Sequence, residues 1–256
     1  MNDVSRPTNP VGMSAEEAAV RADLAACYRL VADYGWDDLA GTHMSAVVPG
    51  EEAMLVNPFG MLFEEMTASS LVKISLKDGK VLQDTPYPVN PTSYTIHSAV
   101  HQVRRDVGCA IHLHTVHNMA VSALAEGLLP LTQSALLITE DLAYHEFEGV
   151  AVNLEERERL QRDLGDRNHM ILRNHGALVV GATVAEAFKR AYAFEKICAA
   201  QCLTLAMGRP LNPIAPAAAA QLAGRPASNK QARLELMWQG LRNRLDRRDP
   251  RYREQG

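Results

Sequence analysis

Apolar positions recur along the chain at two spacings, and the spacing of three to four residues predicts helices. The first such run, from Val20 to Val31, follows a capping box formed by Ser14 and Glu17, so a helix is expected over about 14–33. Other helices are predicted where N-cap residues and glycine or proline stops bracket the same spacing: 90–103, 115–126, 153–165, 183–207 and 230–245.

Short apolar runs between turn residues predict strands. They lie at 45–48, 53–56, 71–76, 81–83, 109–114, 135–139, 150–153, 170–172 and 177–180. The runs 71–76 and 81–83 flank an Asp-Gly pair and predict a hairpin. Strands interleaved with helices, some joined by hairpins, favour an α/β fold in which helices cover a mixed sheet.

The stretch H-L-H-T-V-H at 112–117 places three of the nine histidines of the chain within six positions. In a strand over 109–114, His112 and His114 point to one face because side chains alternate. Two such imidazoles can reach one metal ion, although H-x-H also occurs as ordinary polar residues at a strand end. His175 strengthens the metal interpretation, because it lies in R-N-H-G between two apolar strands, where functional side chains gather.

The remaining histidines leave alternatives open. His97 and His101 stand four residues apart on one predicted helix, a spacing that fits metal binding or hydrogen bonding at a helix–sheet or subunit contact. His117 falls in the helix after the strand and is expected beside the metal site rather than in it. His43 and His145 fall near strand ends and are candidates to line a pocket.

Composition narrows the class of protein. Hydrophobic residues make up 47% of 256 residues, enough for one large core, and the net charge of -4 gives no reason to expect nucleic acid. No apolar run approaches the roughly 20 residues that span a membrane. Four scattered cysteines and the lack of a signal pattern predict a cytoplasmic protein. The expected organisation is an N-terminal arm (1–13), one domain (14–208), a linker (209–229) and a C-terminal helix with a basic tail (230–256).

Five motifs together resemble the class II aldolase/adducin superfamily over about residues 15–207. They are N-P-F-G-M-L-F-E-E-M-T-A-S-S-L-V-K-I, N-P-T-S-Y-T-I-H-S-A-V, C-A-I-H-L-H-T, A-Y-H-E-F-E-G and L-R-N-H-G-A-L-V-V-G. The resemblance implies a three-layer α/β/α sandwich around a mixed, largely antiparallel sheet, assembled as a homo-oligomer, with a tetramer favoured. It also implies that His112, His114 and His175 match the metal ligands of the sugar-phosphate aldolases, so a divalent ion is expected, zinc first and manganese or iron as alternatives.

The chain departs from those aldolases where they bind and process a sugar phosphate. Ser93 stands at the position of the metal-binding, proton-transferring glutamate. The phosphate-binding G-N-x-S becomes T-H-M-S at 42–45, and Phe59 replaces a threonine although Gly60 remains. We therefore expect a pocket that takes a small, non-phosphorylated molecule, lined by residues at the matching positions: His43, Ser45, Asn57 and Gly60.

These features favour a metal-dependent carbon–carbon lyase that cleaves or decarboxylates a small hydroxy or keto acid. Tyr144 or His145 is the expected proton donor, Ser93 occupies the catalytic position, and Glu140 is a candidate fourth ligand. Two other classes fit the same residues: a non-haem iron oxygenase, and a non-catalytic binding module like the adducin head domain.

Overall fold

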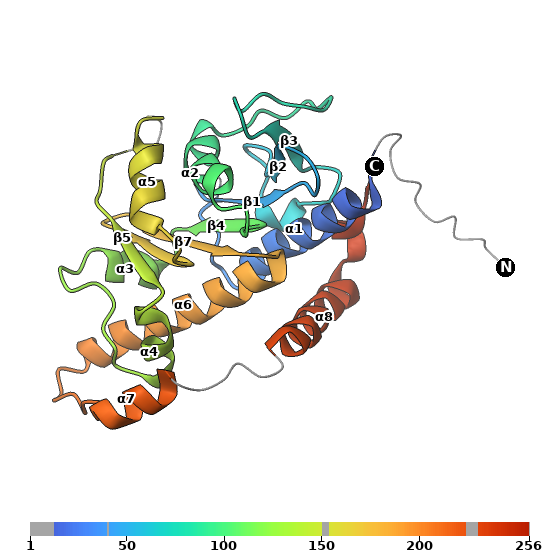
Figure 1. Cartoon of the computed structure of the whole chain (residues 1–256). Helices are drawn as coiled ribbons and strands as arrows, with labels where there is room; N and C mark the ends of the chain where they lie inside the picture. The colour runs from blue at the N-terminus through green and yellow to red at the C-terminus, as the bar shows by residue number, and fades with distance from the viewer. Residues whose placement is uncertain (1–12, 40, 150–153, 224–229, 256) are drawn as a thin grey trace.

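A seven-stranded mixed sheet forms the centre of the computed structural model, which describes residues 13–39, 41–149, 154–223 and 230–255 (Figure 1). Its order is β3-β2-β1-β4-β7-β6-β5. All neighbouring strands are antiparallel except β5 and β6, which are parallel. The strands are β1 (His43–Val47), β2 (Ala53–Val56), β3 (Val72–Ser75), β4 (Cys109–Leu113), β5 (Leu142–His145), β6 (His169–Leu172) and β7 (Gly176–Gly181).

Helices cover both faces of the sheet, which confirms the three-layer α/β/α prediction (Figure 1). On one face lie α1 (Ala15–Asp33), α3 (Val116–Ser122) and α6 (Val184–Ala206), and on the other lie α2 (Pro91–Val103) and α5 (Glu156–Leu164). The remaining helices are α4 (Gln133–Thr139), α7 (Pro216–Ala223), α8 (Lys230–Arg248) and the short 3₁₀ helices Phe63–Glu65 and Pro250–Arg253.

Side-chain caps fix the helix starts that the sequence predicts. Ser14 accepts from the backbone N–H of Glu17 at 3.0 Å, and Thr183 accepts from that of Glu186 at 3.2 Å. Asn90 caps α2 by accepting from Thr92 N–H at 3.0 Å. Each cap satisfies a backbone donor that has no partner within the helix, so these residues determine where the helices begin.

Strand alternation on β4 separates the core from the site. Cys109, Ile111 and Leu113 pack into the larger core with α1 and α6, whereas Ala110 belongs to the core under α2 and α5. His112 has the same parity as Ala110 and pairs directly with His43 of β1. The histidines of both strands are thereby presented to the layer of α2.

The structure corrects one predicted element and shows an unpredicted helix within another. Residues 135–139, expected as a strand, lie in the helix α4, because Thr132 accepts from Ala135 N–H and the buried residues Ala135 and Ile138 are spaced by three. The stretch 209–229, expected as a linker, contains the helix α7, whose alanines have high helix propensity.

Other elements are shorter than predicted, or cannot be compared. The hairpin over 71–83 is reduced to β3 and one bridge between Ile74 and Val81. The helix expected over 115–126 ends at Ser122. The predicted strand 150–153, the cap at Asn153 and nearly all of the N-terminal arm lie outside the described residues. No helix in the described part of the chain is both long and apolar enough to cross a membrane.

Candidate metal centre

Three histidine side chains converge at one end of β4. The Nε2 atom of His114 lies 2.9 Å from Nε2 of His112 and 2.9 Å from Nε2 of His175. Among the described residues these three form the one group whose donor atoms lie close enough together to share an ion. The sequence prediction that they meet is therefore realised in the geometry.

The third histidine is brought to the strand by a tight turn. His175 follows Asn174, which adopts a positive φ of 55°, and precedes Gly176 at the start of β7. A Cβ atom at Gly176 would lie 2.5 Å from the carbonyl oxygen of Leu113. Only glycine allows this approach, and the approach places His175 against His114.

Hydrogen bonds set the orientation of two rings. Nδ1 of His112 donates to the carbonyl oxygen of Ala177 at 3.0 Å, and Nδ1 of His114 donates to Oδ2 of Asp38 at 3.0 Å. Both partners only accept, so each Nε2 carries a lone pair. Two lone pairs 2.9 Å apart repel each other unless a proton or a cation lies between them, which is the arrangement that a metal ion relieves.

Burial keeps the imidazoles of His112 and His175 neutral, the form that binds metals. The pKa of His112 lies well below the usual range because the ring is buried and because His43 and His114 are close. The pKa of His175 is lowered to about 4, by burial first and then by His114. Two nitrogens on one tetrahedral zinc ion lie about 3.3 Å apart, so small outward ring movements suffice. The donor set therefore fits a divalent ion.

Asp38, between α1 and β1, is a site residue that the sequence prediction missed. It is separated from His114 by 76 positions, and no motif marks it. Glu195 of α6 was also missed: it is buried, it accepts from the hydroxyl of Thr115, and its Oε1 lies 2.6 Å from Nδ1 of His117. These contacts tie His117 and Thr115, at the start of α3, to α6; the expected place of His117 beside the metal site stays a prediction.

A buried polar chain, a row of hydrogen-bonded side chains formed by His43, Ser45, His97 and His101, lies next to the three histidines. Nδ1 of His43 lies 2.7 Å from Nε2 of His97, and the hydroxyl of Ser45 lies 2.7 Å from both His97 and His101. The rings of His43 and His112 are centred 5.0 Å apart. The four residues of this buried polar chain are each at most 1% exposed. His97 and His101 therefore make hydrogen bonds, one of the two roles that the sequence left open. His43 contacts His97, and Ser45 contacts His97 and His101, so neither faces an open pocket.

Of the residues at the positions where the aldolases bind a metal or a substrate, two make structural contacts in this protein. Ser93 is buried and donates to the carbonyl oxygen of Asn90 at 2.7 Å, within the first turn of α2. Asn57 is also buried and contacts the hydroxyl of Tyr28 at 3.0 Å. Gly60 has a φ of 91° and open space around it, so it remains accessible to a ligand.

The two proposed proton donors point to opposite sides of β5. The hydroxyl of Tyr144 accepts from Leu128 N–H at 3.1 Å, and its ring lies under the guanidinium of Arg173, 4.3 Å from the ring centre. His145 faces the other way, toward a small cavity of about 10 Å³ that His175 also lines. His145 therefore lies on the same side of the sheet as the three histidines, and Tyr144 does not.

The cavity beside His145 is acidic. Nδ1 of His145 lies 2.7 Å from Asp163, whereas its buried Nε2 has no hydrogen-bond partner and faces Glu156 at 3.6 Å and Glu148 at 3.8 Å. Burial raises the pKa of the Glu156 carboxyl. Glu156 was not anticipated from the sequence. Glu140, the candidate fourth ligand, is exposed at the end of α4 and is not in the metal cluster.

Comparison with known proteins identifies the family. The Class II Aldolase and Adducin N-terminal domain matches residues 22–202 of the chain. The chain belongs to the class II aldolase and adducin family. Within this family, a Pseudomonas aeruginosa protein that carries a provisional aldolase class 2 name is 48% identical over 94% of this chain and 95% of its own length.

Both adducins and aldolases are among the proteins that are similar to this chain. Mouse α-adducin is 41% identical over 80% of this chain, which spans 28% of that protein. The crystal structure of an aldolase II superfamily protein from Pseudomonas syringae gives a TM-score of 0.89 at 40% identity, covering 94% of this chain and 98% of that one. L-fuculose 1-phosphate aldolase from Glaciozyma antarctica gives 0.81 at 26% identity, covering 97% of each. The family therefore includes enzymes and adducins.

The contact between Asp38 and His114 leads to a first prediction. Replacing Asp38 with asparagine should weaken zinc binding about 10- to 100-fold, because the carboxylate both orients the ring and raises its basicity. Competition with a chromophoric chelator measures the affinity. Asp37→Asn is the matched control, since it removes the neighbouring charge and should leave the affinity unchanged. Equal affinities for the two variants would contradict the assigned role of Asp38.

Proposed function

We propose that the protein is a metal-dependent carbon–carbon lyase that acts on a small, non-phosphorylated hydroxy or keto acid. The observation that supports it most is the convergence of three imidazole Nε2 atoms, two of them on rings that Ala177 and Asp38 orient. Three protein ligands leave further coordination positions for a substrate, as in catalytic rather than structural metal sites.

His112, His114 and His175 would hold the ion. When bound, a zinc, manganese or iron ion would supply Lewis acidity that stabilises negative charge developing on a carbonyl oxygen as a carbon–carbon bond breaks. Decarboxylation breaks that bond directly, and aldol cleavage breaks it as the proton of the hydroxyl group on the cleaved carbon passes to a base, so neither reaction first needs removal of an α-proton. The serine at position 93 is compatible with such a reaction, although it provides no carboxylate.

A non-phosphorylated substrate fits the neighbouring side chains. The positions that correspond to phosphate-binding G-N-x-S carry His43 and Ser45, whose polar atoms are engaged with His97, His101 and Thr92. Donors that are already paired and buried cannot bind a phosphate dianion without breaking these bonds. Gly60 retains the open approach that a carboxylate or hydroxyl group needs.

His145 is the proposed proton donor. Its Nε2 faces the cavity that His175 also lines, and Asp163 fixes the ring through Nδ1. A proton held at this nitrogen, between Glu156 and Glu148, could be transferred to the carbon atom released by bond cleavage. Tyr144 is less suited because its hydroxyl is held by Leu128 on the opposite side of β5.

The test is a panel of small 2-keto acids with a 4-hydroxyl group or a β-carboxylate, incubated with protein loaded with zinc, manganese or iron. We expect stoichiometric release of a shorter keto acid, followed by NMR, at a rate above that of the free metal ion. An iron-loaded sample that consumes oxygen during turnover would point to an oxygenase instead. No product with any metal would contradict the proposal.

Replacing His145 with glutamine should lower the turnover of an accepted substrate about 100- to 10,000-fold, the usual effect of losing a general acid. The metal content should stay unchanged, because His145 is not one of the converging ligands. The control is Tyr144→Phe, which should retain most activity. The assignment of His145 fails if Tyr144→Phe is the more damaging substitution.

The similarity to α-adducin supports a second candidate, a non-catalytic binding module. The same metal-loaded panel separates the two, because a binding module would release no product even though it retains the ion.

A further inference from the structure

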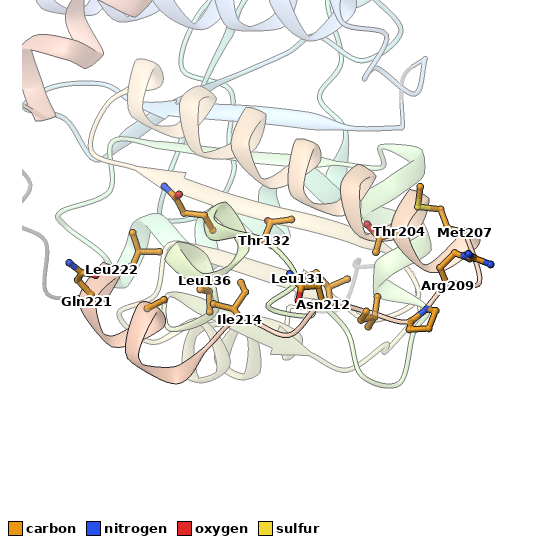
Figure 2. Close-up of a pocket in the computed structure, with 14 residues that line it drawn as sticks. Leu131, Thr132, Leu136, Thr204, Met207, Arg209, Asn212, Ile214, Gln221 and Leu222 are labelled. Carbon is orange, nitrogen blue, oxygen red and sulfur yellow. The ribbon is translucent and has the colours of Figure 1, made fainter.

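A wide groove lies away from the histidine cluster. It measures about 820 Å³ and is formed by the start of α4, the end of α6, residues 209–214 and α7 (Figure 2). None of its lining residues is a metal ligand or belongs to the buried polar chain. Its volume falls within the range of about 300–1,000 Å³ that is typical of small-molecule sites.

Apolar side chains predominate in the lining, and the two ends of the groove differ. Figure 2 shows Met207 and Arg209 at one end and Gln221 and Leu222 at the other. The larger apolar side chains of the wall are Leu131, Leu136, Met207, Leu211, Ile214 and Leu222. An elongated apolar molecule could therefore lie along the groove.

Charge distinguishes one end of the groove. Arg209 is the only charged residue of the fourteen that line it, and all the others are apolar or neutral. In the part of the chain that the structure describes, no hydrogen bond or ion pair is assigned to its guanidinium. A single unpaired guanidinium at the end of an apolar groove complements one carboxylate on an alkyl chain.

We propose that this groove binds an unbranched amphipathic monocarboxylate, with the alkyl chain between α4 and α7 and the carboxylate on Arg209. The site is separate from the metal centre, so it does not depend on the lyase proposal. Each buried methylene group should strengthen binding up to about fourfold, and the exposed ion pair should contribute up to about fivefold.

The test is calorimetric titration of the full-length protein with dodecanoate and octanoate, kept below their micelle concentrations. We expect dodecanoate to bind more tightly than octanoate, and dodecanol or dodecylammonium to bind more weakly than dodecanoate. Arg209→Gln should weaken dodecanoate binding about fivefold and leave dodecanol unaffected. Arg233→Gln, which removes an exposed cation of α8 outside the groove, is the matched control.

A second variant tests the location. Ala218 lines the groove from the exposed side of α7, so Ala218→Trp should fill the cavity without disturbing the core and should abolish binding of both acids. Unchanged binding by Ala218→Trp, equal binding of dodecanoate by Arg209→Gln and the wild type, or preference for the cation would each overturn the proposal. So would sedimentation data in which the wild type self-associates, binds no acid and loses the association in Ala218→Trp, because the groove would then be filled by a second copy.

Discussion

Replacing His114 with alanine is expected to remove the metal ion from the purified protein. His114 is the central member of the cluster, because its Nε2 contacts both His112 and His175 at 2.9 Å. Two imidazoles without the third leave an incomplete ligand set, so the affinity for zinc should fall at least 100-fold, more than after the loss of an outer partner such as Asp38. Elemental analysis of freshly purified protein measures this, and any metal-dependent turnover should fall with it.

The matched control is His117→Ala, three positions along the chain. His117 is bound to Glu195 and stands outside the converging nitrogens, so this variant should keep its full metal content. Far-ultraviolet circular dichroism should show that both variants are folded. If His114→Ala retains the ion of the wild type, the three-histidine centre is wrong.

The second large expected effect is a loss of stability at acidic pH. Burial lowers the pKa of His101 to about 4, whereas in the unfolded chain its pKa is close to the ordinary histidine value of 6.5. The unfolded state therefore binds more protons between these values, so the free energy of unfolding should decrease as pH falls from about 6.5 to 4. A shift of this size corresponds to roughly 3 kcal/mol for His101 alone. Burial lowers the pKa of His43 and His97 as well, which adds to the effect.

Urea unfolding at a series of pH values, with the protein first stripped of metal by a chelator, measures this dependence. His101→Asn keeps a polar side chain near Ser45 but cannot titrate, so its stability should vary less steeply with pH. The slope decides the question, because the variant is also expected to have a lower stability at pH 7. Identical slopes for the variant and the wild type would show that His101 is not buried as a neutral imidazole.

Short sequence patterns predicted most of the fold because helix capping and strand alternation depend on interactions between residues that are close in the sequence. The caps at Ser14, Asn90 and Thr183 and the alternation along β4 depend on residues within a few positions of one another. The error at 135–139 has the same origin: a short apolar run fits a strand or a helix, and the cap at Thr132 decided for the helix.

The candidate site was predictable where a single strand determines it. Side-chain alternation along β4 places His112 and His114 on one face of the strand. The polar turn before β7 contains His175. Asp38 and Glu195 come from distant segments, at sequence separations of 76 and 80 from the residues that they contact, so no spacing could reveal them.

For the proton donor, the sequence could not separate Tyr144 from His145. Neighbours on a strand face opposite sides, and only the packed structure shows which face of β5 meets the metal cluster. The same holds for Glu156 of α5, whose position opposite His145 depends on how that helix packs on the sheet.

The turn that carries His175 also bears on local opening of the sheet. The β4–β7 ladder ends at Leu113 and Ala177, next to His114 and His175, which are 61 positions apart in the chain. Strand ends are where a ladder frays first, because no further pair restrains them. An ion held by these histidines would join the two fraying ends directly. Backbone amides at this end of the β4–β7 ladder should then exchange more slowly when the ion is bound, so the metal centre would also stabilise the pairing of the two central strands.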